Sequence, residues 1–478
     1  MKTVKRILKF ILIIIGALLV FIAVMLLVDK QSTNYLNSKN IKSANNNSFL
    51  ITNVNIIPMN QDTVLVNKMV YIKDGIIQKI ADRIETNGVE TLDAKNKYLT
   101  PGLIDMHVHV WDRYELGLYL SNGVTAVRNL WGMPMHLRIK EEVNNNEIIS
   151  PIFFTTGPKL TGPEFIGDDN LNLNSPHEAK EKVISFKKRG YDFIKTYYGL
   201  DKEIFDAVIE QARVSNIDIV AHPSQKVPYS YHFNSQIKSI EHAEEIIQQP
   251  LNYNLLDTLK LKEVVNDFSK SKHSTFSPTL TVYNNIYQML IDDNILELEQ
   301  LQFMNPLIKR IDSKAQFDRW HSTKLRDSSI IKAIKNQHDL HIKIIKKLHK
   351  EGVTFICGTD AGIGVTIPGF SIHKELAFYK EAGLSNYEVL KTATINASKT
   401  HSIMNNMGTI EVGKIANLLL TDSNPLLELS TLKNPSTIFI KGRKLNKDSL
   451  ENFEEKARNR KNLIASAVRY LEHLIFEK

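Results

Sequence analysis

The sequence contains a single cysteine, Cys357, so no disulfide can form within one chain. It also lacks internal repeats of the solenoid kind, and its one biased stretch is a short segment rich in Asn, Ser and Lys. The fold must therefore be held together by an ordinary hydrophobic core. With 478 residues, 43% of them apolar, the chain can form a barrel-sized domain and a smaller one.

Nucleic-acid-binding motifs are absent as well, although the formal net charge is +8. Lys and Arg are spread along the chain, with a denser stretch over residues 309–350. Such a spread is typical of a solvated surface rather than of a nucleic-acid site. We therefore expect no nucleic-acid partner, and at most a weak attraction to an anionic membrane surface.

Long hydrophobic runs are scarce, and the one that occurs is informative. Phe10–Val28 is an unbroken apolar run, long enough to cross the roughly 30 Å hydrocarbon layer as a helix. Basic residues precede it, which predicts a cytoplasmic N-terminus and an exported remainder of the chain, periplasmic or extracellular. No small-x-small motif follows, as a cleaved signal peptide would need. We expect residues 1–28 to be an uncleaved single-pass anchor, with a cleaved signal peptide as the alternative.

Short β-like segments occur near both ends of the globular part. Asp74-Gly75 lies between two apolar runs and indicates a hairpin. Strand-like segments return at Ile415–Thr421 and Ile438–Gly442. The pattern predicts one small β-sandwich domain built from residues 49–100 together with 404–446.

The middle of the chain alternates strands with helices such as Pro176–Arg189 and Lys202–Ser215. With the strand that ends at His107, the candidates amount to eight, which is the pattern of a (β/α)8 barrel over residues 101–403. The other candidate strands are Gly123–Leu130, Ile152–Thr156, Asp192–Tyr198, Asp218–His222, Ser239–His242, Thr275–Thr281 and Thr354–Thr359.

The remaining segments are expected to be a flexible linker over 29–48, a helical insertion in the barrel over about 251–350, and a C-terminal helix over 447–478. The terminal helix is expected to pack on the body. A contact in a homo-oligomer and a contact with a membrane surface are the alternatives. Three histidines of the insertion are expected on a solvated helical face: His338, His341 and His349.

A histidine pair gives the first indication of chemistry. His107 and His109 alternate along a strand, so both side chains point to the same face, where two imidazoles make half a zinc site. Asp360 follows an apolar strand and precedes Gly362, a place that would also suit a turn residue. Each signal alone is weak, because paired histidines and turn aspartates are common.

Further polar residues also lie at or near predicted strand ends. His222 and His242 each end a short apolar strand, and active sites of (β/α)8 barrels are built at those carboxyl ends. Lys195 lies within a strand between apolar neighbours. A buried lysine needs an acidic partner or a lowered pKa, and a neutral amine can react with carbon dioxide to form a carbamate. Both readings of Lys195 stay open at this point.

Taken together, these residues resemble the amidohydrolase superfamily, and within it the imidazolonepropionase-like branch that includes metal-dependent, prolidase-like dipeptidases. The resemblance covers about Phe49 to Leu445. Its motifs are Thr100–His109, Gly123–Arg128, Phe193–Lys195, Ala221–His222, Ile240–His242, Gly358–Gly362 and Gly408–Lys414.

The resemblance implies two divalent metal ions, most often zinc. It places the first ion on His107, His109 and Asp360, the second on His222 and His242, and a carbamate of Lys195 between them.

The implied reaction is hydrolysis of the C–N bond of a dipeptide or another small or cyclic amide by a metal-bridging hydroxide. Asp360 would accept the proton of the nucleophile and pass it to the leaving nitrogen. The alternatives are a mononuclear hydrolase or deaminase of the same superfamily, and a non-catalytic membrane-tethered binding protein on the same scaffold. Candidates for binding the polar end of the substrate are Tyr197, Tyr229 and Tyr231.

Overall fold

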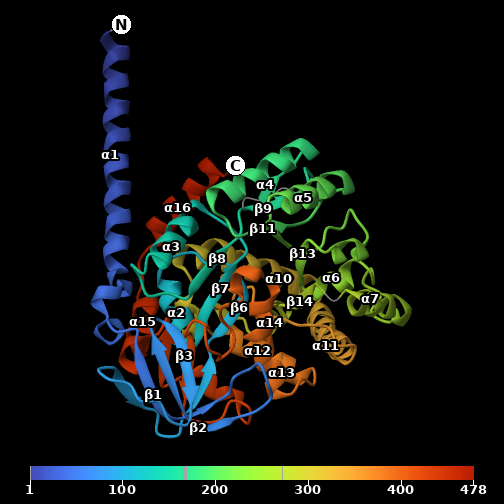
Figure 1. Ribbon diagram of the computed structural model, residues 1–478. Helices are drawn as coiled ribbons and strands as arrows, with labels where there is room; N and C mark the ends of the chain where they lie inside the picture. The colour runs from blue at the N-terminus through green and yellow to red at the C-terminus, as the bar shows by residue number, and fades with distance from the viewer. Residues whose placement is uncertain (1, 165–169, 272, 478) are drawn as a thin grey trace.

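A long helix, α1 (Lys2–Ser32), projects from a globular body in the computed structural model, which describes residues 2–164, 170–271 and 273–477 (Figure 1). The apolar side chains of α1 are exposed along most of its length, for example Leu12 and Leu19. Among the described helices, α1 is the one long and apolar enough to cross a membrane.

The segment predicted to be a flexible linker is folded against the body instead. It forms three short 3-10 helices, η1 (Asn34–Leu36), η2 (Ser38–Asn40) and η3 (Lys42–Ala44). Its apolar side chains Leu36 and Ala44 are fully buried, and Ile41 is 7% exposed. The segment has a polar composition because its apolar residues are few and lie among Asn, Ser and Lys. Those few apolar residues nevertheless pack into the core, which holds the segment against the body.

One mixed sheet combines the two ends of the globular part. Its strands are hydrogen-bonded in the order β17-β16-β15-β5-β1-β2-β3, with β4 beside β1, and β15 pairs with β5 in antiparallel fashion. The predicted hairpin at Asp74-Gly75 is confirmed between β2 and β3, and both residues have positive φ. The strands form one continuous sheet, so a sandwich of two sheets is not confirmed. They are β1 (Phe49–Ile56), β2 (Leu65–Lys73), β3 (Ile76–Ala81), β4 (Glu90–Asp93), β5 (Tyr98–Pro101), β15 (Leu418–Thr421), β16 (Thr437–Ile440) and β17 (Arg443–Asn446).

Parallel strands form the middle of the body, in the sheets β6-β7-β8 and β10-β9-β11-β12-β13-β14. Isolated parallel bridges connect Thr156 with Phe193, Phe276 with Phe355, and Val108 with Ala361. The strands are β6 (Leu103–Val108), β7 (Val124–Asn129), β8 (Ile152–Thr155), β9 (Lys159–Thr161), β10 (Asn170–Asn172), β11 (Phe193–Thr196), β12 (Asp218–Ala221), β13 (Ile237–Glu241) and β14 (Thr275–Ser277). The helices that follow them include α2 (Tyr114–Ser121), α3 (Pro134–Asn144), α4 (Pro176–Arg189), α5 (Lys202–Val214), α6 (Glu244–Gln248), α12 (Ser371–Glu381), α13 (Asn386–Thr392) and α14 (Ile395–Thr400).

The segment Thr354–Thr359 was predicted to be a strand, and it forms only isolated bridges. Its backbone groups bond to several different partners: the amide of Cys357 donates to Thr392, and the carbonyl of Cys357 accepts from Met106. The amide of Ile356 also donates to Phe276 and that of Thr359 to His107, so the segment lies between β14 and β6 although it forms only isolated bridges.

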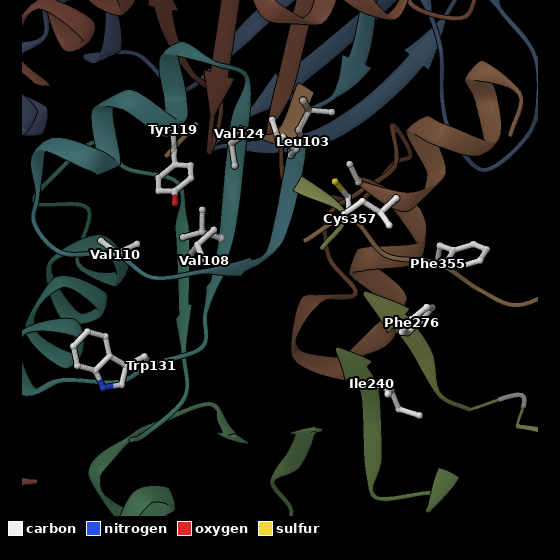
Figure 2. Close-up of a cluster of buried hydrophobic side chains, with 14 of the residues drawn as sticks. Leu103, Val108, Val110, Tyr119, Val124, Trp131, Ile240, Phe276, Phe355 and Cys357 are labelled. Carbon is white, nitrogen blue, oxygen red and sulfur yellow. The ribbon is translucent and has the colours of Figure 1, made fainter. Parts of the chain in front are cut away.

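The strands present two differently packed faces. Ile240, Phe276 and Phe355 belong to the large cluster that packs against the helices (Figure 2). A smaller cluster fills the space on the other face and includes Phe193 and Val220. Because side chains alternate along a strand, the residues two positions further on share this inner face. The alternation therefore directs Lys195 and His222 toward the interior.

The insertion is helical, as predicted, but two of its histidines are not on a solvated face. His338 and His341 are 7% and 1% exposed. The ring of His338 lies 4.8 Å from Phe378, and that of His341 lies 4.8 Å from Tyr283. Their spacing places both on the side of α11 that packs on the body. The helices here are α7 (Thr258–Lys270), α8 (Thr281–Ile291), α9 (Pro306–Ile308), α10 (Lys314–Arg326) and α11 (Ile330–Lys350).

The C-terminal segment forms two helices, α15 (Lys447–Arg458) and α16 (Leu463–Phe476), where a single helix was predicted. Between them Arg460 is 6% exposed and forms an ion pair with the buried Asp112 at 2.9 Å. Asn462 also donates to Asp112, at 2.8 Å. The helix is interrupted where the chain turns these two side chains inward.

Candidate metal centre

The histidine pair at the end of β6 meets an aspartate. Nε2 of His109 lies 2.7 Å from Oδ1 of Asp360, and Nε2 of His107 lies 3.2 Å from the same atom. One ligand atom from each residue lies within 4.8 Å of the other two, and all three residues are buried. Histidine nitrogens and a carboxylate oxygen at these separations are suitable ligands for a zinc-like ion.

Asp360 is held by an unusual backbone conformation. Its φ is +59°, a left-handed value that costs a non-glycine residue roughly 1–2 kcal/mol. The amide of Asp360 donates to the carbonyl of His107 at 2.8 Å, which keeps the turn beside β6. Burial opposes ionisation, but His107 and His109 hold the pKa of Asp360 well below its usual range. The carboxylate is therefore charged at neutral pH.

Two further histidines lie beside this cluster. The ring of His242 is 4.8 Å from that of His107 and 4.5 Å from that of His222. Nδ1 of His242 lies 2.9 Å from Oγ1 of Thr279, and His242 has a φ of +73°. Burial lowers the pKa of both His222 and His242. Both imidazoles are therefore neutral at pH 7, the form that binds metal ions.

Lys195 points to the same interior. It is 1% exposed, and its Nζ has no hydrogen-bond partner among the described residues. Burial lowers the pKa of Lys195 to about 8. An unpaired amine buried among imidazoles is costly, unless a carbamate or a metal ion satisfies it. The donor set is thus compatible with a metal site, and the amine of Lys195 lines the same cavity as these ligands.

These residues line a cavity of about 700 Å³. Several of its wall residues come from loops, from the insertion or from the C-terminal helix, and sequence patterns did not point to them. Trp111 and Trp131 form an aromatic wall with ring centroids 4.5 Å apart, and Nζ of Lys159 lies 4.5 Å from the ring centroid of Tyr197. The unpredicted lining residues include Trp111, Trp131, Lys159, Asn170, Tyr198, Glu244, Asp312, Gln316, Arg319 and Tyr470.

The three tyrosines named as substrate candidates lie in different places. Tyr197 lines the cavity that contains the histidines. Tyr229 lines a separate cavity of about 490 Å³ beside α7. Tyr231 is half-buried, and its hydroxyl bonds to Asp206 of α5. Only Tyr197 is brought to the candidate metal centre, because Tyr229 and Tyr231 belong to the short helix η4 (Tyr229–Phe233), which turns away from it.

A buried network supports the ligands from behind. Oε2 of Glu241 accepts a hydrogen bond from Nδ1 of His107 at 2.8 Å, and Oε1 accepts from Arg128 at 2.8 Å. Nη1 of Arg128 lies 2.8 Å from Nε2 of His401, whose Nδ1 lies 2.8 Å from Asp218. Glu241 precedes His242 in the sequence, and this adjacency was the available signal for its role.

Parallel strands flanked by helices, with histidines and an aspartate at their carboxyl ends, are an arrangement typical of enzymes with a TIM-barrel type of fold, whose active sites lie at those strand ends. The model of the amidohydrolase family matches residues 301–445. A dihydroorotase of Carboxydothermus hydrogenoformans is 44% identical over 181 residues, 37% of this chain and 41% of the relative. The chain therefore spans less than half of that relative's length.

Two solved structures share the fold over most of the chain. A bottromycin amidohydrolase matches with a TM-score of 0.72 and 21% identity, over 88% of this chain and 92% of that one. A Xaa-Pro dipeptidase with methionine bound in its active site matches with a TM-score of 0.64 and 19% identity, over 84% and 100%. The chain therefore shares the fold of these two structures over most of its length, and its sequence resembles the amidohydrolase family over residues 301–445.

Proposed function

We propose that this protein is a membrane-anchored, metal-dependent hydrolase that cleaves the C–N bond of a small amide. The observation that carries the proposal is the convergence of His107, His109 and Asp360, whose ligand atoms lie within 4.8 Å of one another. His222, His242 and Lys195 surround the same cavity. Six potential ligands on one interior surface are hard to explain by packing alone.

The donor set would hold two divalent ions, zinc being the best match for imidazole and carboxylate ligands. His107, His109 and Asp360 would bind one ion, and His222 and His242 the other. Lys195 would bridge them as a carbamate, since its pKa of about 8 leaves part of the amine neutral and able to react with carbon dioxide. When bound, the ions would activate water as the nucleophile and polarise the substrate carbonyl.

Asp360 is the proposed proton carrier. Its carboxylate lies beside His107 and His109 at the candidate metal centre, where it can accept a proton from the attacking water. The same carboxyl group can then protonate the leaving nitrogen, which makes departure of an amine feasible. Its left-handed backbone fixes the carboxylate beside His107 and His109 before substrate arrives, which limits reorganisation during the reaction.

The cavity suits a dipeptide-sized or cyclic amide. Its volume of about 700 Å³ lies in the range of small-molecule sites. Lys159 and Arg319 offer cationic groups for a substrate carboxylate, whereas Trp111, Trp131 and Tyr470 offer apolar surface. The names of the relatives, a dihydroorotase and a Xaa-Pro dipeptidase, fall within this substrate class.

A mononuclear centre is the second candidate. Among the described residues, the group of potential ligands whose atoms all lie within 4.8 Å of one another consists of His107, His109 and Asp360. In this alternative Lys195 stays an amine, and His222 and His242 contact substrate in a hydrolase or a deaminase. Metal content near one ion per chain, without added mass on Lys195, would favour it.

The architecture proposed for this function has three parts. The parallel segments would close as a (β/α)8 barrel over 101–403, joined to a smaller β domain of 49–100 with 404–446. Helix α1 would cross the membrane with its N-terminus in the cytoplasm, because basic residues precede the apolar run. The catalytic body would then lie on the exported side.

The test uses the full-length protein in detergent, stripped with a chelator and reloaded with Zn²⁺, Mn²⁺ or Co²⁺. Release of amine or acid is measured on a panel of Xaa-Pro and other dipeptides and of cyclic amides. We expect activity with at least one substrate, restored by metal and lost about 10²–10⁴-fold in Asp360→Asn. Asp339→Asn, at a half-exposed site of α11 where the carboxylate pairs with Lys335, is the matched control. Activity that survives chelation, or an equally active Asp360→Asn protein, would contradict the proposal.

A further inference from the structure

The C-terminal helix α16 has two unlike faces. One is buried against the body and carries Arg469 and His473, and Tyr470 lines the catalytic cavity. The other is apolar and exposed: Leu471 is 54%, Ile475 72% and Phe476 70% exposed. Ile464, Val468, Leu471 and Ile475 recur at helical spacing along this face. An exposed stripe of this kind needs an apolar partner.

Helix α1 lies beside this stripe. The two helices pack together, and an ion pair between Asp29 and Arg469 joins them. Leu26 of α1 and Val468 of α16 line the same cavity at the foot of α1. Ile22, Met25 and Leu26 are half-covered, whereas the residues of the apolar run before Ile22 are exposed. The last two turns of the apolar run Phe10–Val28 therefore lie alongside α16 (Figure 1).

We propose that the exposed face of α16 is a second membrane contact, embedded in the lipid leaflet on the catalytic side. This inference rests on the membrane anchor proposed above. If the run Phe10–Val28 spans the hydrocarbon layer, an apolar surface beside its last turns lies at the depth of the acyl chains and headgroups. The bilayer that receives α1 then also covers Leu471, Ile475 and Phe476.

The charges next to α16 fit an anionic leaflet. The last turn of α4 carries Lys187, Lys188 and Arg189. Arg189 pairs with Glu477 just after α16, so this basic turn lies at the end of the apolar stripe. An apolar face bordered by basic side chains is typical of helices that lie in a membrane interface.

The contact would fix the catalytic cavity close to the bilayer. Tyr470 and Leu471 are neighbours in sequence, yet one lines the cavity and the other faces away from the body. Only the thickness of one helix, about 10 Å, would separate substrate from lipid. The enzyme would therefore hydrolyse amides at the membrane surface, held there by two elements.

The experiment places one fluorescent label at a time on the full chain. Cys357 is fully buried and burial raises the pKa of its thiol, so it does not compete for a maleimide dye. Ile475→Cys tests α16, and Leu19→Cys tests the anchor. Leu259→Cys in α7, a leucine 75% exposed on a helix remote from α1 (Figure 1), is the matched control. Each labelled protein is reconstituted into phosphatidylcholine–phosphatidylglycerol vesicles that contain doxyl-labelled acyl chains.

We expect acyl-chain quenching of the labels at residues 19 and 475, and iodide quenching from water of the label at 259. The inference would be overturned if iodide quenched the label at residue 475 as strongly as the label at residue 259. If the label at residue 19 were still quenched from the lipid, the membrane anchor would remain supported. A label at 475 shielded from both quenchers would indicate a second protein copy and would also overturn it. Absence of lipid quenching at residue 19 would contradict the proposed membrane anchor, and the inference that rests on it would also be wrong.

Discussion

The carboxylate of Glu241 accepts a hydrogen bond from Nδ1 of His107 at a distance of 2.8 Å, and both side chains are almost fully buried. This bond fixes the imidazole so that Nε2 faces Asp360. The other oxygen of Glu241 is bound by Arg128, whose guanidinium has no exposure. A single buried carboxylate therefore orients a candidate ligand and neutralises a buried cation.

Replacing this carboxylate should weaken metal binding and stability together. In Glu241→Gln we expect metal affinity to fall about 10–100-fold, because the orienting charge is lost. Unfolding free energy should fall by about 3 kcal/mol, because Arg128 keeps a buried charge without its partner. Metal titration and thermal unfolding measure the two effects. Glu472→Gln, which removes the half-exposed partner of Arg138, should change stability by less than about 1 kcal/mol and leave metal affinity intact.

Lys195→Ala tests the carbamate. We expect activity to fall about 100-fold or more, because the bridging anion is missing. Millimolar acetate should restore part of the activity, since a small carboxylate can occupy the space of the carbamate, and methylammonium should not. Recovery with methylammonium alone would mean that Lys195 acts as an amine. Intact-mass analysis of the native enzyme under carbon dioxide gives an independent reading.

Glu115 should make the protein less stable as the pH rises. Burial, reinforced by Asp112, raises the pKa of Glu115 to about 8. A carboxyl group with a raised folded-state pKa stabilises fully below its unfolded pKa of about 4.5, and this stability is lost as the pH rises toward 8. Glu115→Gln should therefore lose less stability between pH 5 and pH 8 than the wild type.

Thermal unfolding at several pH values measures this difference, which is on the order of a few kcal/mol at most. Glu381→Gln, at an exposed site of α12, serves as the control and should follow the wild-type pH dependence. A Glu115→Gln protein with the wild-type slope would show that Glu115 is ionised in the folded state.

Tyr470 should affect substrate binding more than chemistry. It extends from α16 into the cavity, and its ring centroid lies 6.2 Å from Trp111 and 6.1 Å from Trp131. Tyr470→Ala should raise KM about tenfold, equivalent to about 1.4 kcal/mol, with kcat changed little, because the ring contributes wall surface and no reacting group. Ile464→Ala, on the exposed face of the same helix, should leave detergent-phase kinetics unchanged. A fall in kcat with constant KM would assign Tyr470 to the reaction itself.

Local sequence patterns predicted a large part of the fold. β7, β8, β11, β12 and β13 and the helices α4 and α5 lie where apolar runs and helical periodicity placed them. Thr354–Thr359 was predicted to be a strand and lies between β14 and β6, but its pairing with them is limited to isolated bridges. The burial of His338 and His341 could not be predicted either, because the sequence does not reveal which face of α11 packs against the body.

The candidate site was also predicted only in part from the sequence. His107, His109, Lys195, His222, His242 and Asp360 were named from their places at or near strand ends, and they line one cavity. Lys159, Trp131 and Tyr470 were not named, since each reaches the cavity from a β segment, a loop or a helix distant in sequence. Tyr229 and Tyr231 were named and lie elsewhere, because adjacency to a ligand strand does not determine the direction of a loop.

The sequence by itself determined the resemblance to the amidohydrolase superfamily, the candidate ligands and the apolar run of α1, because each depends on residue type and local spacing. Only the tertiary structure decided that the segment after α1 is folded, that Glu241 and Arg128 support His107, and that α16 closes the cavity on one side and exposes an apolar face on the other. These features depend on contacts between residues hundreds of positions apart, such as Asp29 with Arg469 and Asp112 with Arg460. Local patterns carry no information on such pairs, since their energy arises only when the chain has folded.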